Sequence, residues 1–275
     1  MKNLVALILM TLLVSACIPM AEEQPTPTVD LLAGRLTFAG STTIQPLVAQ
    51  LAEVYRNDHP NVLFDIAAGG SSVGIQAIHD GTADVGMVSR HLSEEELAGI
   101  DSFQIAIDVL AIVVNPGIPV DSLTLSQLQD IYLGRVLNWS ELGGPDLAIV
   151  PIQRETTSGS RGAFDEIALE KQDASAPALL TAITAGDMAA LVGSNPGAIG
   201  YLGFGNLDDS TRVIAINGVK PDLETARNGT YVLIRPLFLI TGPLTQPLAL
   251  SFIDFVLSPA GQEAVQAAGW IPVNE

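Results

Sequence analysis

Short apolar runs alternate with amphipathic helical patterns over almost the whole chain after residue 35, and this alternation constrains the fold more than any other feature. Runs with the length and composition of buried strands occupy 35–40, 61–68, 83–89, 103–115, 147–153 and 230–241. Helical patterns lie among and after them, at 41–58, 71–81, 127–136, 163–168, 187–194, 248–258 and 259–270. Strands that alternate with helices in this way favour an α/β fold with helices on both faces of the sheet.

Composition narrows the class of function. The chain has 275 residues, which suits one large domain or two modest ones, and 48% of them are hydrophobic. Its 12 Lys+Arg against 30 Asp+Glu give a net charge of -18. A nucleic-acid-binding protein needs a basic stripe to neutralise phosphates, and none is found, so no nucleic-acid partner is expected.

The N-terminus has the pattern of an export signal. Lys2 precedes an apolar run at 4–16, which is shorter than the roughly 20 residues of a permanent membrane span. The letters VSAC before and at Cys17 resemble a bacterial lipobox, which implies that residues 1–16 are removed and that Cys17 carries lipid such as palmitate. Residues 17–34 then form a lipidated, flexible tether. The alternatives are an N-terminal membrane anchor or a buried helix.

Cys17 is also the one cysteine of the chain. A catalytic thiol elsewhere, a cysteine-based zinc site and an intramolecular disulfide are therefore excluded.

Four loops rich in serine, threonine and glycine each follow a predicted strand, at 39–44, 69–74, 87–93 and 154–161. Three of them open a helix, whose first N–H groups lack intrahelical partners and attract anions. Glycine permits a close backbone approach and hydroxyl groups add donors, so together these loops predict one small oxyanion site. The candidate residues are Ser41, Thr42, Thr43, Ser71, Ser72, Ser89, Arg90, Arg154, Ser158, Gly159, Ser160 and Arg161.

A purely structural interpretation competes with this one. Serine and threonine commonly cap helices, glycine commonly forms turns, and Arg90 by itself is more typical of a surface ion pair. The recurrence of the pattern favours the anion site, because three of only nine arginines lie in or beside these loops.

The segments FAGSTTIQPL, GGSSVGIQAIHDGTADVGMVSR, VVNP, LTLSQLQDIYLGRVLNW and RETTSGSRGAF together resemble the periplasmic phosphate-binding proteins of bacterial ABC importers, the PstS family. The resemblance runs from about residue 36 to 273. It implies a two-lobed periplasmic-binding-protein fold of type II, in which each lobe is a central sheet flanked by helices and two crossover strands join the lobes. One lobe would comprise 35–114 plus 235–275 and the other 115–234.

The same resemblance assigns roles to residues. Thr42, Thr43 and Ser71 would donate to phosphate from one lobe, and Arg154, Ser158, Gly159 and Ser160 from the other. Arg161 matches the end of the family's SGTR-like motif, with Ser160 in place of threonine. Well-known members of the family place an aspartate after the third strand to accept the proton of hydrogen phosphate, and here Ser89 and Arg90 stand there, as in a subgroup of the family. Glu155 and Asp108 are candidate replacements.

Other functions are less well supported. The chain has no G-x-S-x-G nucleophile motif and no G-x-x-x-x-G-K-[ST] loop, and its three histidines lie in unrelated contexts. We expect no catalysis, no cofactor and no metal. The expected protein is a monomeric, lipid-anchored, exported binding protein that delivers phosphate to the permease subunits of an ABC importer. A binding protein for sulfate or molybdate, and a phosphate sensor, remain open alternatives.

Overall fold

The structure is a computed structural model that describes residues 32–273, which form one α/β unit of ten strands and eight α-helices. The predicted export signal, Cys17 and nearly all of the predicted tether lie outside the described residues. Among residues 32–273, no helix combines the length and the apolar character that crossing a membrane would require.

The elements follow one another in the alternating order that the sequence predicts. The strands are β1 (Gly34–Gly40), β2 (Val62–Ala68), β3 (Val85–Val88), β4 (Asp101–Val114), β5 (Ser122–Leu123), β6 (Val150–Arg154), β7 (Leu180–Ala182), β8 (Ala198–Gly203), β9 (Arg212–Ile216) and β10 (Ile234–Thr241). The α-helices are α1 (Gln45–Arg56), α2 (Ser71–His79), α3 (Leu125–Tyr132), α4 (Gly159–Ile167), α5 (Ala185–Ser194), α6 (Leu223–Arg227), α7 (Pro247–Leu257) and α8 (Pro259–Ala267). Two 3-10 turns are η1 (Trp139–Leu142) and η2 (Phe204–Asn206).

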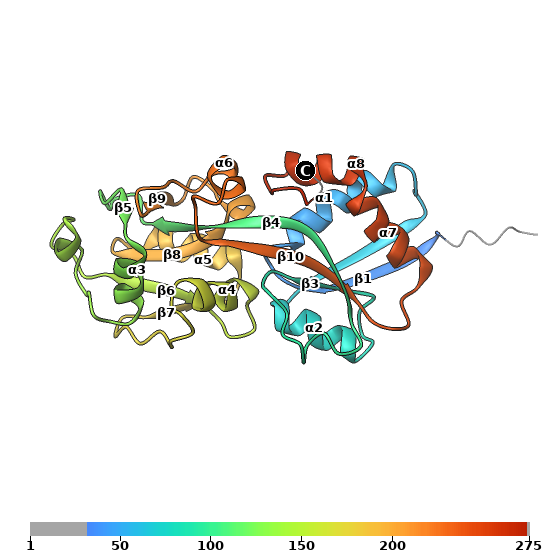
Figure 1. The fold of residues 1–275 in the computed structure, drawn as a ribbon, viewed down its shortest axis with the longest axis horizontal. Coiled ribbons are helices and arrows are strands. Elements are labelled where there is room, and N and C mark those ends of the chain that lie inside the picture. The colour runs from blue at the N-terminus through green and yellow to red at the C-terminus, as the bar shows by residue number, and fades with distance from the viewer. Residues whose placement is uncertain (1–31, 274–275) are drawn as a thin grey trace, which may run out of the picture. The chain divides into compact units, whose positions relative to one another are not determined.

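The strands form one hydrogen-bonded path in the order β2-β1-β3-β10-β4-β8-β6-β7, with β9 on β4 and β5 on β9. The first three strands are parallel, as are β6, β7 and β8, whereas β4 and β10 run antiparallel to each other and to their neighbours. The first part of β4 pairs with β10 and its last part with β8. Figure 1 shows β4 and β10 side by side, running from one group of strands to the other.

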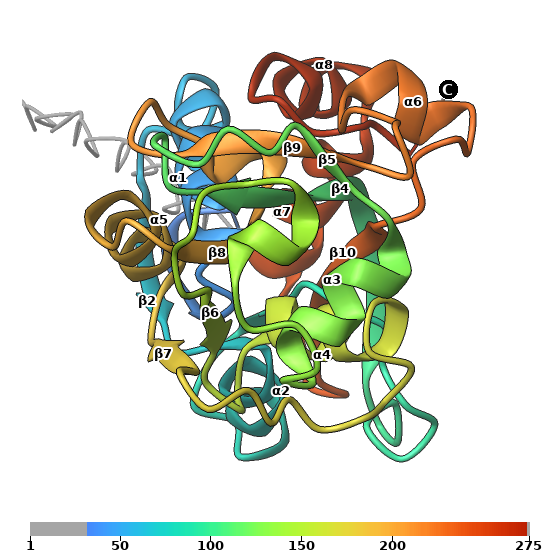
Figure 2. The same cartoon turned by 90° about the vertical axis from the view of Figure 1, so that its left-hand side faces the viewer.

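Two large hydrophobic cores lie at the two ends of this path. The first core packs β1, α1, α7 and α8 around side chains such as Phe38, Phe252 and Trp270. The second core packs around Tyr132, Trp139, Phe164 and Tyr201. Each fully buried large side chain contributes roughly 1.5–3 kcal/mol. In Figure 2, α5 lies on one side of β6 and β8, and α3 and α4 lie on the other.

Strand β4 belongs to both cores, because Ile105 and Ala106 pack in the first and five of the six residues at 109–114, all except Ala111, pack in the second. Its neighbour β10 contains Pro236, which lacks an N–H and would interrupt a central strand. Because β3 pairs only with residues 238–240 of β10, Pro236 has a strand partner on the β4 side alone. The two strands therefore form a narrow connection between the cores.

The predicted α/β class is confirmed, and the long strands and helices lie where periodicity places them. The predicted strand at 230–241 begins only at Ile234. Sequence patterns did not indicate β5, β7, β9 or α6, because elements of two to five residues are too short to show a period. The carboxyl ends of β1, β2, β3 and β6 carry the four loops that the sequence singled out.

Candidate functional site

The loops after β1 and β2 begin their helices without side-chain caps. Neither Ile44, at the start of α1, nor Gly70, at the start of α2, makes a capping side-chain hydrogen bond. Ser71 instead accepts the backbone N–H of Ser89, over 3.0 Å at its Oγ. Ser71 therefore does not cap α2, and its hydroxyl oxygen is oriented by the loop after β3.

Five buried hydroxyl groups meet where these loops approach α4, and we call them the hydroxyl cluster: Ser41, Thr43, Ser71, Ser89 and Ser160. None of the five residues is more than 4% exposed. The Oγ of Ser41 donates to the Oγ of Ser89 over 2.8 Å, and the Oγ of Ser71 lies 3.4 Å from that same atom. Across the cluster, Thr43 Oγ1 lies 3.1 Å from Ser160 Oγ, so the loop after β1 touches the first turn of α4.

Gly159 permits this close approach. A Cβ at position 159 would lie 2.1 Å from Ser71 Oγ and 2.6 Å from Ser89 Oγ, distances that no side chain tolerates. Ser158 caps α4, because its Oγ accepts the N–H of Arg161 over 3.3 Å. The first turn of α4 thus lies against the hydroxyl cluster, and the helix dipole adds a partial positive charge there.

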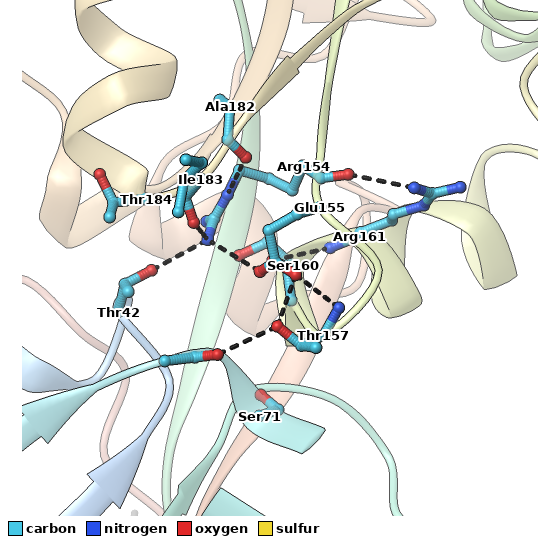
Figure 3. Close-up of polar contacts among 12 residues, drawn as sticks. Thr42, Ser71, Arg154, Glu155, Thr157, Ser160, Arg161, Ala182, Ile183 and Thr184 are labelled. Atoms are coloured by element: carbon cyan, nitrogen blue, oxygen red, sulfur yellow. Dashed lines mark hydrogen bonds and ion pairs between the residues drawn. The ribbon is translucent and has the colours of Figure 1, made fainter. Parts of the chain in front are cut away.

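Arg154, the last residue of β6, supplies a buried charge beside the cluster. Its side chain is 2% exposed, and its Nη2 donates to Thr42 Oγ1 over 3.1 Å and to the carbonyl oxygen of Ile183 over 2.8 Å. Its Nε donates to the carbonyl oxygen of Ala182 over 3.2 Å. Figure 3 shows the guanidinium group between Thr42 on one side and Ala182 and Ile183 on the other.

The positive charge of Arg154 is only weakly compensated. The carboxylate of Glu155 lies 3.7 Å away, is partly exposed, and also accepts hydrogen bonds from the N–H and hydroxyl of Thr157. Burial lowers the pKa of Arg154, and the nearby charge of Arg235 adds to this shift, whereas Tyr201 and the carboxylates of Glu155 and Asp187 oppose it without cancelling it. A desolvated guanidinium without a close carboxylate is costly in the free protein. The site therefore has a surplus of buried positive charge.

Backbone contacts also join the loop after β6 to the loop after β2. Thr157 Oγ1 lies 3.0 Å from the carbonyl oxygen of Gly69, and the N–H of Ser72 donates to the carbonyl oxygen of Thr157 over 3.0 Å. A Cβ at Gly70 would lie 2.6 Å from that carbonyl oxygen. The loops after β1, β2, β3 and β6 thus meet at one place in the fold.

The other two candidate arginines have different partners. Both terminal nitrogens of Arg90 donate to Glu96, over 2.8 and 2.7 Å, and one of them also reaches Ser72 Oγ. Arg161 pairs with Asp165 over 3.2 Å and donates to the backbone carbonyl of Arg154. Of the three arginines expected to surround one anion, the structure brings only Arg154 to the hydroxyl cluster with its charge uncommitted.

The two candidate proton acceptors also differ. Asp108 is fully buried, its Oδ2 accepts two hydrogen bonds from Arg235, and its Oδ1 accepts the N–H of Phe204 over 3.0 Å. Burial raises the pKa of Asp108, and Arg235 opposes that shift. Both oxygens of Asp108 are thus occupied, whereas Oε1 of Glu155 has only the long contact with Arg154.

Sequence reasoning did not single out Arg235, Thr157 or Tyr201, which all contact candidate residues. Tyr201 accepts the N–H of Arg154 at its hydroxyl over 2.9 Å. One available signal was the pair of opposite charges, Asp108 and Arg235, each alone in an otherwise apolar run. Among the described residues, no group of three or more His, Cys, Asp or Glu side chains has an arrangement that could hold a metal ion.

The sequence of this chain is similar to those of known binding proteins. Residues 23–260 match the family model described as PBP superfamily domain. The phosphate-binding protein PstS of Bacillus subtilis is 33% identical over 251 residues, which cover 88% of this chain and 82% of that protein. The PstS protein of Pseudomonas aeruginosa is 32% identical over 273 residues, covering 88% of this chain and 84% of that protein.

Solved structures show the same likeness. A candidate phosphate ABC transporter substrate-binding protein from Clostridium perfringens, solved with bound phosphate, matches with a TM-score of 0.85 and 36% identity. The match covers 88% of this chain and 100% of that one. An ABC-type phosphate transport receptor from Vibrio cholerae matches with a TM-score of 0.71 and 32% identity, covering 86% of this chain and 99% of that one.

Proposed function

We propose that this chain captures inorganic phosphate and delivers it to an ABC importer. The chain belongs to the PstS family of phosphate-binding proteins within the PBP superfamily. The hydroxyl cluster, Thr42, Arg154 and the first N–H groups of α4 would replace the water shell of the anion. Each charge-assisted hydrogen bond of this kind contributes roughly 1.5–3 kcal/mol, so several short donors outweigh the diffuse repulsion from a net charge of -18.

The weakly compensated charge of Arg154 is the observation that carries this proposal. Its guanidinium group is buried between the loops after β1 and β7, and its nearest ion pair is the 3.7 Å contact with Glu155. A bound anion would supply the missing negative charge at the place where hydroxyl and amide donors converge. We therefore keep Arg154, Thr42, Thr43, Ser71, Gly159 and Ser160 as proposed phosphate contacts.

Sulfate is the second candidate, because no carboxylate stands where the family pattern puts the proton acceptor. A buried carboxylate that faces an anion rejects fully ionised sulfate and accepts the proton of hydrogen phosphate. The oxygens of Asp108 are taken, which leaves Glu155 as the proposed acceptor.

The remaining parts of the proposal follow from the family pattern and the N-terminus. Residues 35–114 plus 235–275 and residues 115–234 would act as two lobes that close on phosphate, with β4 and β10 as crossovers. The protein would be a monomer without a catalytic step, held at the outer face of the cell membrane by lipid on Cys17. The permease subunits would recognise the closed form.

Calorimetric titration of the mature protein tests this proposal. The ligands are phosphate, sulfate and arsenate, each at two pH values. We expect phosphate and arsenate to bind similarly, because they share shape and protonation, and sulfate to bind at least tenfold more weakly. Equal binding of sulfate and phosphate would refute the proposed selectivity. Absence of any phosphate binding would refute the function itself.

A further inference from the structure

A buried ion pair stands behind the hydroxyl cluster, outside the proposed phosphate contacts. Arg235 on β10 and Asp108 on β4 are direct partners in the strand register, and each residue is 1% exposed. The Nε and Nη2 of Arg235 donate to Asp108 Oδ2 over 3.0 and 2.7 Å. Asp108 therefore compensates the charge of Arg235, and that charge is not free to bind an anion.

Arg235 also donates hydrogen bonds to two residues of the hydroxyl cluster, Thr43 and Ser89. Its Nη2 donates to Thr43 Oγ1 over 3.2 Å, and its Nη1 donates to the carbonyl oxygen of Ser89 over 3.3 Å. A hydroxyl oxygen that accepts an N–H must direct its own proton elsewhere. Because Ser160 Oγ lies 3.1 Å from the same oxygen of Thr43, the available direction leads across the cluster, towards the first turn of α4.

Gly203, at the end of β8, lies against the ion pair and leaves no space for a side chain of its own. A Cβ at this position would lie 2.5 Å from Asp108 Oδ2, 3.0 Å from Arg235 Nη2 and 3.0 Å from Thr43 Cγ2. Its φ of -64° and ψ of 144° suit any residue, so the backbone does not require glycine here. Packing against Asp108, Arg235 and Thr43 is the reason for the missing side chain.

We propose that Arg235 is a positioning residue of the anion site. It holds the hydroxyl of Thr43 with its proton directed at the anion, it fixes the backbone of Ser89, and Asp108 holds Arg235 in place. This inference rests on the proposed function, because it assigns Arg235 a role in phosphate affinity that acts through Thr43. It adds a residue that touches neither the anion nor solvent.

A double-mutant cycle tests the coupling. The four proteins are the wild type, Arg235→Lys, Thr43→Val and the double variant, each titrated with inorganic phosphate by calorimetry and unfolded separately in urea. Lysine keeps the charge and the ion pair with Asp108, but it lacks the planar fork whose two terminal nitrogens contact Thr43 and the backbone of Ser89 from separate positions. We expect Arg235→Lys to weaken phosphate binding about tenfold alone, and less than threefold when Thr43→Val is already present.

A matched control separates positioning from general destabilisation. Arg212 also pairs with an aspartate, Asp121, over 2.8 Å, and also donates to backbone carbonyls, those of Ile118 and Val120. Arg212→Lys should lower the urea midpoint and leave phosphate affinity within twofold of the wild type. Equal weakening by Arg235→Lys in both backgrounds, or none in either, would overturn the positioning role.

A second variant covers the case in which Arg235→Lys does not fold. Gly203→Ala pushes Asp108, Arg235 and Thr43 apart while keeping all three, and it goes through the same cycle with Thr43→Val. Its effect on phosphate affinity should again shrink at least threefold in that background, and an undiminished effect would refute the inference. If the wild type binds no phosphate, the proposed function fails; if it binds but the cycle shows no coupling, only the role of Arg235 fails.

Discussion

Arg154 and Arg235 are both buried arginines, yet their charges are compensated in different ways. Arg235 lies between the two connecting strands, where Asp108 accepts two of its hydrogen bonds on one oxygen. Arg154 lies at the end of β6, donates to the neutral oxygens of Thr42, Ala182 and Ile183, and reaches a carboxylate only at 3.7 Å. The charge of Arg235 is paired within the fold, whereas the charge of Arg154 has no close carboxylate.

This difference separates a structural charge, that of Arg235, from the charge that we propose is kept for a ligand, that of Arg154. A buried ion pair adds little to stability when it is intact, but the loss of one partner leaves the other charge desolvated and unpaired. A buried charge without a pair already carries that cost in the free protein, and an anion that binds there relieves it. Removal of the Arg235 charge should therefore lower mainly the stability of the protein, and removal of the Arg154 charge should lower mainly its phosphate affinity.

Removal of the structural charge should have the largest effect. We expect Arg235→Met to lower the free energy of unfolding by about 3–5 kcal/mol, because it leaves Asp108 buried without a cation. Urea unfolding without phosphate measures this loss. The control is the double variant Arg235→Met with Asp108→Leu, which should recover most of the stability because it removes both charges. A loss below about 1 kcal/mol in the single variant would contradict the assignment of a structural charge.

Removal of the charge kept for the ligand should act on affinity instead. We expect Arg154→Met to weaken phosphate binding by at least about 2 kcal/mol, roughly 30-fold, while the free energy of unfolding without phosphate does not fall. Calorimetry and urea unfolding on the same protein separate the two quantities. Arg135→Met is the matched control, because Arg135 forms an exposed pair with Asp130 over 3.0 Å, and it should change neither quantity strongly. Unchanged phosphate affinity in Arg154→Met would refute the proposed site.

The sequence singled out Arg154 as a candidate and missed Arg235, for a physical reason. Arg154 stands in a loop whose hydroxyls and glycines are next to it in the chain, so its chemistry shows in one short segment. Arg235 is separated from Asp108 by 127 residues, and only the register of β4 and β10 brings them together. Local composition carries no information on that register.

The candidate loops were predictable for a similar reason. The parallel strands β1, β2 and β3 bring their carboxyl ends to one edge of the sheet, so the loops that follow them meet there. Strand β6 runs antiparallel to them, because three antiparallel pairs separate β3 from β8, and its carboxyl end therefore faces theirs. The partners of individual side chains were not predictable to the same degree. Arg161 pairs with Asp165 at a spacing of four residues in α4, a relation the motif itself contains, yet proximity to the loop favoured an anion contact. Arg90 pairs with Glu96 only because the intervening turn brings them together.

Substitution of Arg90, a third and partly exposed arginine, should have the smallest effect on stability and on phosphate affinity. Its side chain and that of Glu96 are 17% and 27% exposed, so the pair contributes about 0.5–1 kcal/mol at neutral pH. The Arg90 guanidinium lowers the pKa of Glu96 from its usual 4.5, which means that the folded state favours the ionised carboxylate. This contribution is present above pH 4.5 and is lost as the pH falls through the lowered pKa.

We therefore expect Arg90→Gln to lower the free energy of unfolding by about 0.5–1 kcal/mol at pH 7, and this difference from the wild type should shrink as the pH is lowered towards about 3. Urea unfolding at a series of pH values measures it, with Arg135→Gln as an exposed-pair control. Phosphate affinity should fall by less than tenfold, against at least roughly 30-fold for Arg154→Met. A loss of affinity equal to that of Arg154→Met would show that Arg90 leaves Glu96 to contact the anion, and the site would then hold two ligand-directed charges instead of one.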